Sequence, residues 1–351
     1  MTTFNFNTLC AGRSLTTEES QALFTQVFEG KIDPALLAGI LTALKIKGET
    51  PEEIEGAARA MVAAAAHFPR PRGVEVGEIV GTGGDGMKTI NVSTTTALLA
   101  AAAGLKIAKH GTRGVRGVSS PTGASDLLTA LGVDIRLTPD ESAQLLDATG
   151  FCFCFAQLYH PAMRFAGPVR AALKTRTIFN ILGPLTNPAH PDYALIGVYS
   201  PDLLETVAQT LRLLGVKRAY VVHGSGLDEA AVHGTTEIAE LKEDGTIERS
   251  TLTPADLGAK RLYSIEEIKG GAPADNALIT EAILAGKGTE AQQAFVTANL
   301  ALLLKIGGLA KSLPEAVELA RRTMASGKGL EVLNAHRAYA ASHTASSQKA
   351  A

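Results

Sequence analysis

Polar capping residues and apolar runs divide the chain into a helical beginning and a longer, alternating remainder. Three helix starts follow one another in the first 70 residues, at Thr16-Thr17-Glu18-Glu19, Asp33-Pro34 and Thr50-Pro51-Glu52-Glu53. A hydroxyl or carboxylate at the cap, acids in the first turn and proline at the first helical position each favour a helix start. The segment Phe68-Pro-Arg-Pro-Arg72 then interrupts every pattern, so we place a domain boundary there.

Beyond residue 72, short apolar runs alternate with helical stretches. Strands are expected at 79–80, 105–108, 151–155, 194–199 and 219–223, and helices at 93–103, 125–131, 141–148 and 203–214. Such alternation requires crossover connections, which produce a mostly parallel sheet covered by helices. The sequence therefore predicts the α/β class, with a small α-helical domain over residues 1–72 and a large α/β domain over residues 73–341.

The second half adds a hairpin, a helical end and a hinge. Residues 238–241 and 246–252 flank a short polar turn and predict an antiparallel hairpin. Helical spacing returns from Asn276, and the small, polar residues 342–351 are expected to fray. At about residues 160–190, Gly183-Pro184 and Asn187-Pro188 predict a stiff, turn-rich hinge that packs on the helical domain.

Bulk composition indicates a globular protein. Of 351 residues, 46% are hydrophobic and 19% charged, and the net charge of −2 argues mildly against nucleic acid as a partner. The chain shows neither an apolar run of about 18 residues nor a signal-peptide pattern, so we expect no membrane span and a cytoplasmic location. Cys152 and Cys154 alternate along an apolar strand, where core packing is favoured over a metal pair.

The first candidate for chemistry is Gly81-Thr-Gly-Gly-Asp-Gly86, which follows a predicted strand. Its glycines let the backbone approach a phosphate closely, although a tight turn explains the pattern equally well by itself. Ser93 and Thr94 begin the next helix, where free N–H groups, hydroxyls and the helix dipole favour an anion. Together the two features indicate a phosphate site.

The second candidate is Lys109-His-Gly-Thr-Arg-Gly-Val-Arg-Gly-Val-Ser-Ser120, in which Arg-Gly-Val occurs twice in tandem. Cations and hydroxyls on a glycine-rich loop suit a phosphorylated ligand, and a merely solvated basic loop is the alternative.

The third candidate is the acid pair Asp228-Glu229 in a loop after a strand. Adjacent carboxylates repel unless they are exposed or neutralised by a cation, and oxygen ligands alone favour Mg²⁺. Arg170, in the hinge segment, offers a bidentate fork to a carboxylate, unless it is an ordinary surface arginine.

Five motifs in this order resemble the anthranilate phosphoribosyltransferase family: GTGGDG, NVST, KHGTR with VSS, RTIFNILGPLTNP and HGSGLDE. The resemblance runs from about residue 10 to residue 340. It implies a homodimer formed through the helical domain, a site at the hinge, and Mg²⁺-dependent transfer of a phosphoribosyl group. The donor would be 5-phosphoribosyl 1-pyrophosphate (PRPP) and the acceptor anthranilate, with no nucleic acid or membrane as partner.

The resemblance also implies roles for individual residues. PRPP would be held by Gly81, Gly84, Asp85, Thr89, Asn91, Val92, Ser93, Thr94, Lys109, Ser119 and Ser120. Anthranilate would contact Gly81, His110, Thr112, Arg170 and Gly183, with Arg170 towards its carboxylate. Two Mg²⁺ ions would be held by Ser93, Asp228 and Glu229. No nucleophile or general base is assigned, because the amine acceptor needs neither.

Three departures from the family pattern stand out. Thr112 replaces the usual Asn, which puts one anthranilate contact in doubt, and Ala124 replaces a frequent Ser. In the family pattern, KHG-x-R is followed by one small residue and then VSS. This chain matches that spacing only if one Arg-Gly-Val is removed, so the second copy lengthens a substrate loop by three residues. Whether Arg113 or Arg116 fills the family position is open, and impaired turnover is expected.

Two other functions stay in view. A pyrimidine nucleoside phosphorylase would use free phosphate and would not need the acid pair. A nucleic-acid-binding relative without transferase activity would need a basic groove, against which the net charge and the intact acids argue.

Overall fold

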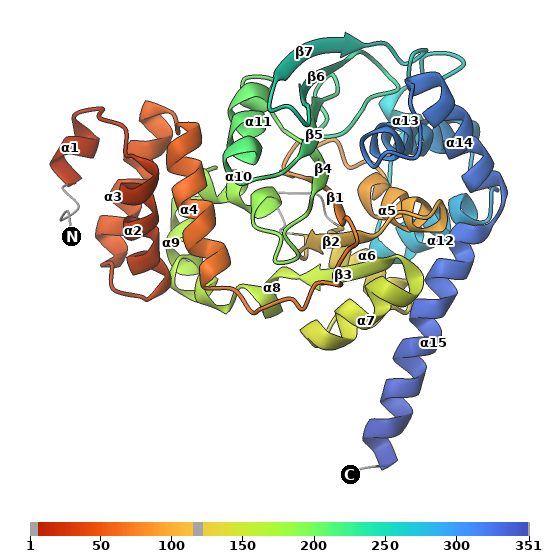
Figure 1. Ribbon diagram of the computed structural model, residues 1–351, viewed down its shortest axis with the longest axis horizontal. Coiled ribbons are helices and arrows are strands. Elements are labelled where there is room, and N and C mark those ends of the chain that lie inside the picture. Colours follow the sequence, from red (N-terminus) through yellow and green to blue (C-terminus); the bar gives the residue numbers. More distant parts are fainter. Residues whose placement is uncertain (1–5, 115–121, 350–351) are drawn as a thin grey trace.

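The N-terminal helices form a lobe on one side of the molecule, drawn in red and orange in Figure 1. The structure is a computed structural model that describes residues 6–114 and 122–349. The lobe contains α1 (Phe6–Cys10), α2 (Thr17–Phe28), α3 (Pro34–Lys47) and α4 (Pro51–Ala63). Thr16 and Thr50 cap α2 and α4 in reciprocal capping boxes, and Asp33 caps α3. The three predicted helix starts are therefore confirmed.

A seven-stranded sheet in the order β3-β2-β1-β4-β5-β6-β7 forms the centre of the second lobe. The first five strands in this order are parallel, whereas β6 and β7 form an antiparallel hairpin on β5. The mostly parallel sheet and the hairpin were both predicted, and both are confirmed. The strands are β1 (Gly77–Gly81), β2 (Ile107–Gly111), β3 (Phe151–Phe155), β4 (Tyr193–Gly197), β5 (Arg218–His223), β6 (Thr236–Leu241) and β7 (Ile247–Leu252).

Helices cover both faces of this sheet, because successive side chains of a buried strand point to opposite faces. On β4, Tyr193 and Leu195 join one core cluster, whereas Ala194 and Ile196 join the core shared with the helical lobe. Figure 1 shows α11 (Leu203–Leu213) on the side of that lobe. The α/β lobe also contains α5 (Val92–Ala102), α6 (Ala124–Ala130), α7 (Pro139–Thr149), η2 (Ile265–Ile268), α12 (Pro273–Leu284), α13 (Glu290–Ile306), α14 (Leu313–Ala325) and α15 (Lys328–Lys349).

The predicted hinge segment is more helical than its prolines suggest. It contains η1 (Pro161–Phe165), α9 (Gly167–Leu173) and α10 (Ile178–Leu185), and α8 (Ala156–Tyr159) directly precedes it. The turn predicted at Gly183-Pro184 is wrong, because both residues lie within α10. Burial of the apolar residues of this short helix outweighs the hydrogen bond that proline cannot donate. A turn does follow at Asn187, whose carbonyl accepts a hydrogen bond from the His190 N–H at 3.1 Å.

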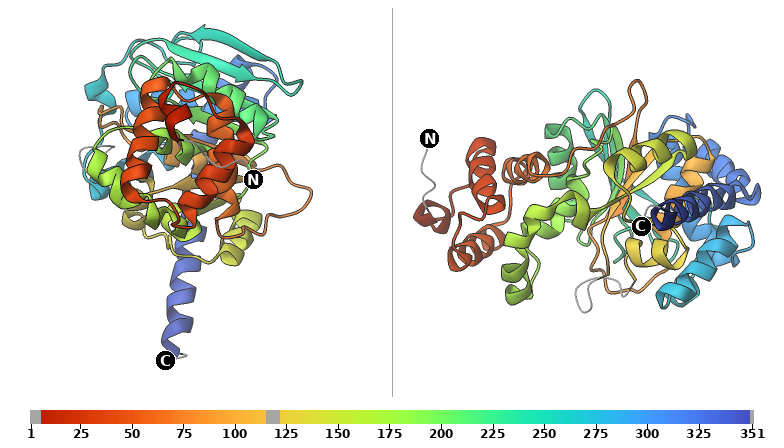
Figure 2. Two further views of the ribbon diagram at one scale, coloured as in Figure 1. Left: turned by 90° about the vertical axis from the view of Figure 1, so that its left-hand side faces the viewer. Right: turned by 90° about the horizontal axis from the view of Figure 1, so that it is seen from below.

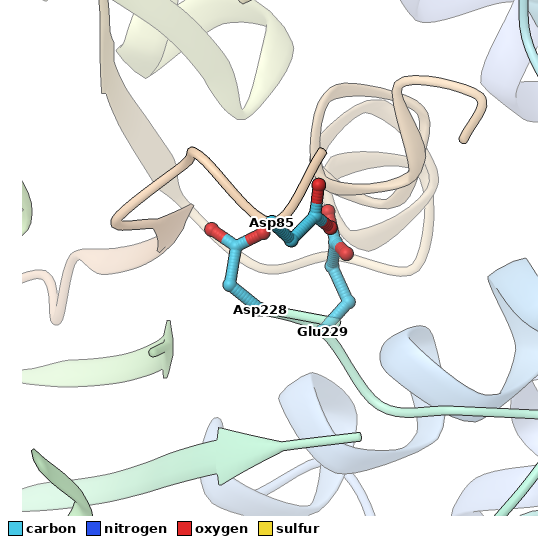
Figure 3. Close-up of side chains that lie close together, drawn as sticks. All are labelled: Asp85, Asp228 and Glu229. Carbon is cyan, nitrogen blue, oxygen red and sulfur yellow. The ribbon is translucent and has the colours of Figure 1, made fainter. Parts of the chain in front are cut away.

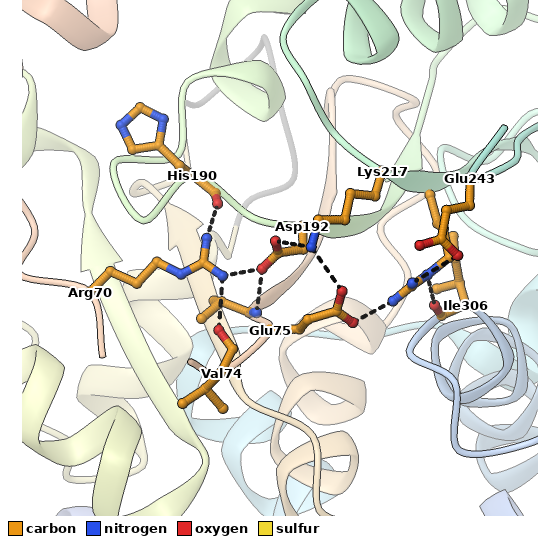
Figure 4. Close-up of polar contacts among 10 residues, drawn as sticks. Arg70, Val74, Glu75, His190, Asp192, Lys217, Glu243 and Ile306 are labelled. Carbon is orange, nitrogen blue, oxygen red and sulfur yellow. Dashed lines mark hydrogen bonds and ion pairs between the residues drawn. The ribbon is translucent and has the colours of Figure 1, made fainter. Parts of the chain in front are cut away.

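A network of charges holds the linker between the lobes against the sheet (Figure 4). Arg70 pairs with Asp192, and Lys217 lies 3.1 Å from both Asp192 and Glu75. Arg218 continues the network at 2.6 Å from Glu75. Partly exposed pairs of this kind contribute about 1 kcal/mol or less each, so the network orients the linker more than it stabilises the fold.

The last helix leaves the body of the molecule. Figure 2 shows the end of α15 extending away from the sheet and its covering helices. Its backbone is helical to Lys349, whereas the sequence predicts that the chain frays from residue 342. Within the described residues, no helix combines the length and the apolar character needed to cross a membrane.

Candidate active site

A cavity of about 640 Å³ lies at the carboxyl ends of β1 and β2, beside the helices of the hinge segment. Strand order reverses between β1 and β4, and ligands of parallel sheets bind at such a switch point. Ser119 and Ser120 lie outside the described residues. Every other residue that the sequence assigned lines the cavity, namely Gly81, Gly84, Asp85, Thr89, Asn91, Val92, Ser93, Thr94, Lys109, His110, Thr112, Arg170, Gly183, Asp228 and Glu229.

The glycine-rich loop after β1 takes a conformation that only glycine adopts readily. Gly83, Gly84 and Gly86 have φ angles of 69°, 82° and 78°, in the left-handed region. Arg176, from the hinge segment, donates a hydrogen bond to the Gly84 carbonyl and stacks 3.9 Å over the Tyr199 ring. The loop is therefore held from the hinge side as well as from the sheet.

Three carboxylates meet at one end of the cavity (Figure 3). Oxygen atoms of Asp85, Asp228 and Glu229 all lie within 4.8 Å of one another. Burial, followed by the charge of Asp85, raises the pKa of Asp228 to about 7. Loss of hydration and the neighbouring Asp228 raise the pKa of Glu229 well above its usual value. The shielded Glu229 Oε2 has no hydrogen-bond partner among the described residues. Three neighbouring carboxylates that repel one another, one of them with an unpartnered buried oxygen, fit a hard divalent cation.

The sequence assigned Asp85 to PRPP binding only and did not predict that it lies in the acid cluster. It follows β1, whereas the acid pair follows β5, and β4 lies between these strands. The available signal was the single acid within a glycine-rich loop. Its distance from the other two acids depends on how the loops fold over the sheet.

Asp228 can cross over β4 and reach β1 because glycine, which has no side chain, occupies the two positions that it passes. A Cβ atom at Gly197 would lie 1.5 Å from the Asp228 carbonyl oxygen, and one at Gly81 would lie 2.1 Å from its Oδ2. The Gly83 N–H donates to the same Oδ2 at 2.5 Å. Asp228 is therefore placed by contacts that any larger residue at Gly81 or Gly197 would prevent.

Two further buried titratable residues, Lys109 and Glu78, interact electrostatically with each other beside the acids. Lys109 is 3% exposed, and its Nζ donates to the Ile79 carbonyl at 2.6 Å. Burial lowers the pKa of Lys109, while the carboxylates of Glu78, Glu229 and Asp228 oppose this shift. Burial likewise raises the pKa of Glu78 to about 7. Sequence reasoning missed Glu78, although an acid inside an apolar strand was a signal that could have revealed it.

Glu78 also positions the end of β2. Its Oε2 accepts hydrogen bonds from the His110 N–H at 2.9 Å and from the Asn187 side chain. His110 in turn has its Nδ1 3.1 Å from the Gly183 carbonyl, whereas its buried Nε2 has no partner among the described residues. Burial, and then the adjacent His160, lower the pKa of His110 to about 3, so the ring is neutral. With Nδ1 donating to Gly183, Nε2 is a free acceptor.

The opposite wall of the cavity is formed by the hinge segment. Arg170 is half-buried on α9, and its guanidinium lies 5.3 Å from the centre of the Phe179 ring. Burial lowers the pKa of Arg170. A cation that faces an aromatic and apolar wall suits a planar acid.

The loop that contains the duplicated Arg-Gly-Val is held near both of its ends by the side chain of Asp126. The N–H groups of Gly114 and Gly123 both donate to Asp126 Oδ2, at 2.8 and 3.0 Å. Arg113 lines the cavity and lies 6.0 Å from the Phe155 ring, whereas Arg116 and the second Arg-Gly-Val lie outside the described residues.

The raised pKa of Asp228 predicts that replacing this residue by Asn stabilises the metal-free protein, by an amount that depends on pH. An unfolded Asp has a pKa near 4, so between about pH 4 and pH 7 the folded protein keeps a proton that the unfolded chain has lost. Asp228 therefore makes the fold less stable as the pH rises through this range. We expect the melting temperature of Asp228→Asn in EDTA to exceed that of the parent by a margin that grows to about pH 7.

Thermal unfolding of both proteins from pH 4 to pH 8 measures this margin. The exposed Asp140→Asn on α7 serves as the control and is expected to give no such trend. A margin that is constant with pH would contradict the buried, protonated state of Asp228.

Over more than nine-tenths of its length, the chain is similar to known proteins of one kind. The Glycosyl transferase family matches through its helical bundle domain over residues 6–65 and its a/b domain over residues 74–330. The anthranilate phosphoribosyltransferase of Tolumonas auensis is 55% identical over 329 residues, covering 94% of this chain and 96% of that protein. The crystal structure of the Thermus thermophilus enzyme of the same name is 39% identical, with a TM-score of 0.89 over 95% of this chain and 98% of that one. The enzyme of this name from Saccharomyces cerevisiae, solved in complex with PRPP and Mg, is 28% identical, with a TM-score of 0.83 over 94% of both chains.

Proposed function

Because the chain belongs to the anthranilate phosphoribosyltransferase family, we propose that it transfers the phosphoribosyl group of PRPP to the amine of anthranilate and releases pyrophosphate. The family that the ordered motifs indicated is confirmed by these relatives. The observation that carries the proposal is the meeting of the glycine loop, the buried Lys109 and the acid cluster in one cavity. The comparisons favour neither a nucleoside phosphorylase nor a nucleic-acid-binding relative.

We assign PRPP to the end of the cavity formed by β1, β2 and the start of α5. The glycine loop presents backbone N–H groups, and Ser93 and Thr94 stand at the positive end of the α5 dipole. Lys109 adds a cation whose burial strengthens its attraction to phosphate. The full proposed set is Gly81, Gly84, Asp85, Thr89, Asn91, Val92, Ser93, Thr94 and Lys109, with Ser119 and Ser120 added from the family resemblance.

We propose that Mg²⁺ is the cation that the acid cluster holds. Asp228 and Glu229 are the predicted ligands, Ser93 is retained from the resemblance, and Asp85 is added because its carboxylate lies in the same cluster. Bound Mg²⁺ would neutralise negative charge that builds on the departing pyrophosphate. Two ions per site remain the prediction from the sequence.

Anthranilate is assigned to the wall formed by α8, α9 and α10. Arg170 would pair with its carboxylate, and the neutral His110 would accept a hydrogen bond through Nε2. Gly183 and Gly81 would bound the ring, and Thr112 offers a hydroxyl where the family usually has an amide. The acceptor amine would thus face the sugar from the hinge side of the cavity.

The chain needs no nucleophile or strong base for this reaction. Breaking the bond between the anomeric carbon and pyrophosphate gives an oxocarbenium-like transition state, which a neutral amine can attack. The task of the residues is to hold two substrates in line and to exclude water. The buried Lys109 and the N–H groups of the glycine loop stabilise the leaving group from fixed positions.

We further propose a homodimer formed through the helical lobe, and the domain division 1–72 and 73–341 with the segment 160–190 as hinge. Family matches at 6–65 and 74–330 are consistent with this division. Ile46, at the end of α3, is 80% exposed and offers apolar surface for such contact. Light scattering of the purified protein measures the subunit number. A cytoplasmic location stays a prediction from the sequence.

Loss of anthranilate fluorescence in the presence of PRPP and Mg²⁺ tests the proposed function. Turnover that requires all three components is expected. Phosphate-dependent release of a pyrimidine would indicate the phosphorylase instead, and salt-sensitive retention on DNA without turnover would indicate the nucleic-acid-binding relative. Absence of turnover at every Mg²⁺ concentration would overturn the proposal.

Arg170→Gln is expected to raise the KM for anthranilate about tenfold or more, while the KM for PRPP changes little. A hydrogen bond between charged groups contributes about 1.5–3 kcal/mol, and each 1.4 kcal/mol is about tenfold in affinity. Steady-state kinetics with each substrate varied measures both constants. Lys174→Gln makes the same change of charge at the exposed end of α9 and serves as the control. Equal effects of the two substitutions would refute the assignment of Arg170.

A further inference from the structure

A segment outside every motif braces the two substrate loops. Residues 268–271 run antiparallel to residues 88–90, with a bridge between Thr89 and Lys269. The Ile90 N–H donates to the Ile268 carbonyl at 3.0 Å, and the Gly270 N–H donates to the Lys88 carbonyl at 2.9 Å. This segment then enters α12, whose first turns contain Asn276.

Asn276 connects this segment to the PRPP end of the cavity. It is 2% exposed, and its Oδ1 accepts from the Gly271 N–H at 2.7 Å. Its Nδ2 donates to the Oδ1 of Asn91 at 2.8 Å. Gly270 permits this approach, because a Cβ there would lie 2.6 Å from Asn276 Oδ1.

Asn91 passes the connection on to the second loop. Its Nδ2 donates to the Thr122 carbonyl at 2.9 Å, and the Thr122 hydroxyl donates to the Gly271 carbonyl at 2.9 Å. The bonds form a closed ring that joins the residues before α5, the residues before α6 and the start of α12. Since each amide has a donor on one side and an acceptor on the other, the ring holds the Asn91 side chain in a single orientation.

In this orientation the Asn91 side chain does not cap the helix that it precedes. An Asn at the N-cap normally accepts a hydrogen bond from the N–H groups of the first helical turn. Asn91 is the N-cap of α5, yet its side chain makes no capping hydrogen bond, and it is instead held at Oδ1 by Asn276 and at Nδ2 by the Thr122 carbonyl. The first-turn N–H groups of α5, at Ser93 and Thr94, are thereby left for an anion.

We propose that Asn276 is a positioning residue that keeps Asn91 from capping α5 and so preserves the anion site at the start of this helix. The inference rests on the proposed function, since it takes the anion to be a phosphate group of PRPP. Asn276 contacts no substrate in this account and acts only through Asn91.

Asn276→Asp tests the inference with the least change in shape. The carboxylate still accepts from Gly271, but it has no N–H to offer Asn91, which becomes free to cap α5. We expect the KM for PRPP to rise about tenfold or more, because a displacement of about 1 Å in a binding group can cost on the order of 100-fold. The KM for anthranilate should change by less than about threefold. Asn276→Ala, which also lacks the N–H, should shift the KM for PRPP in the same direction and serves if the Asp variant does not fold.

Two controls separate positioning from general destabilisation. Thr280→Val removes a buried hydrogen bond to Thr95 from the same helix without touching the amide ring, so it should leave both KM values unchanged. In an Asn91→Ala background, Asn276→Asp should cause little further rise, since the residue through which it acts is gone.

The kinetic pattern decides between the outcomes. A rise confined to the KM for PRPP, and lost in the Asn91→Ala background, supports the inference. A parental KM for PRPP in Asn276→Asp, or equal changes in Asn276→Asp and Thr280→Val, would overturn it. Failure of the parent protein to bind PRPP in calorimetry would overturn the proposed function itself, which the parent measurement reveals separately.

Discussion

The combined substitution of Asp228 by Asn and Glu229 by Gln is expected to lower kcat/KM by on the order of 10³-fold, which corresponds to about 4 kcal/mol in the transition state. Both amides keep the shape of the acids but remove the negative charge that would hold Mg²⁺. Without bound Mg²⁺, no cation at the cluster offsets the negative charge that develops on pyrophosphate. Steady-state kinetics over a wide range of Mg²⁺ concentrations measures the loss.

The same substitution should leave the fold intact or make it more stable. Asp85, Asp228 and Glu229 repel one another without a cation, and burial penalises their charged forms. Replacing two of them by neutral isosteres relieves both costs. Far-ultraviolet circular dichroism and thermal unfolding in EDTA test this half of the prediction.

A matched control is available in the hairpin turn between β6 and β7. Glu243→Gln with Asp244→Asn makes the same chemical change in two adjacent exposed acids that do not line the cavity. This control should turn over like the parent protein. Parental activity in the Asp228 and Glu229 variant, with a normal dependence on Mg²⁺, would refute the metal assignment.

Deletion of residues 116–118 is expected to raise kcat/KM, by up to about 100-fold if the second Arg-Gly-Val displaces a substrate group by about 1 Å. The structure permits this deletion because the two ends of the segment are already close. Gly114 and Gly123 both donate to the same Asp126 oxygen, so a shorter connection can close without moving either end. The closure entropy changes by well under about 1 kcal/mol, so stability should hardly change.

A second variant separates the length of the loop from its chemistry. Arg116→Gly with Val118→Gly keeps the full length and removes the second cation. If the inserted length impairs turnover, only the deletion raises activity. If activity does not rise after the deletion, the second copy is tolerated or useful, and the prediction of impaired turnover is wrong.

The amino-acid sequence determined the features that depend on residues close together in the chain. Caps at Thr16, Asp33 and Thr50 predicted three helices, because a capping side chain bonds to N–H groups two or three residues away. Alternating strands and helices predicted the parallel sheet, and the carboxyl ends of parallel strands lie at the same edge of a sheet, where the loops that follow them come together. Every assigned site residue in the described part of the chain accordingly lines the cavity.

Local signals also failed in places where packing opposed them. Gly183-Pro184 predicted a turn, yet the apolar face of α10 is buried between the lobes and keeps both residues helical. The propensity of two residues is worth only a few kcal/mol, and burial of several large apolar side chains exceeds it.

Only the tertiary structure decided which distant residues share a charge or a hydrogen bond. Asp85 reaches Asp228 because Gly197 leaves room for a loop to cross β4, and Glu78 faces Lys109 because β1 and β2 are neighbours. Asn276 meets Asn91 across 185 positions of sequence. Spacing along the chain carries no information about such pairs, because electrostatic and hydrogen-bond energies depend on distances in space that the complete fold sets.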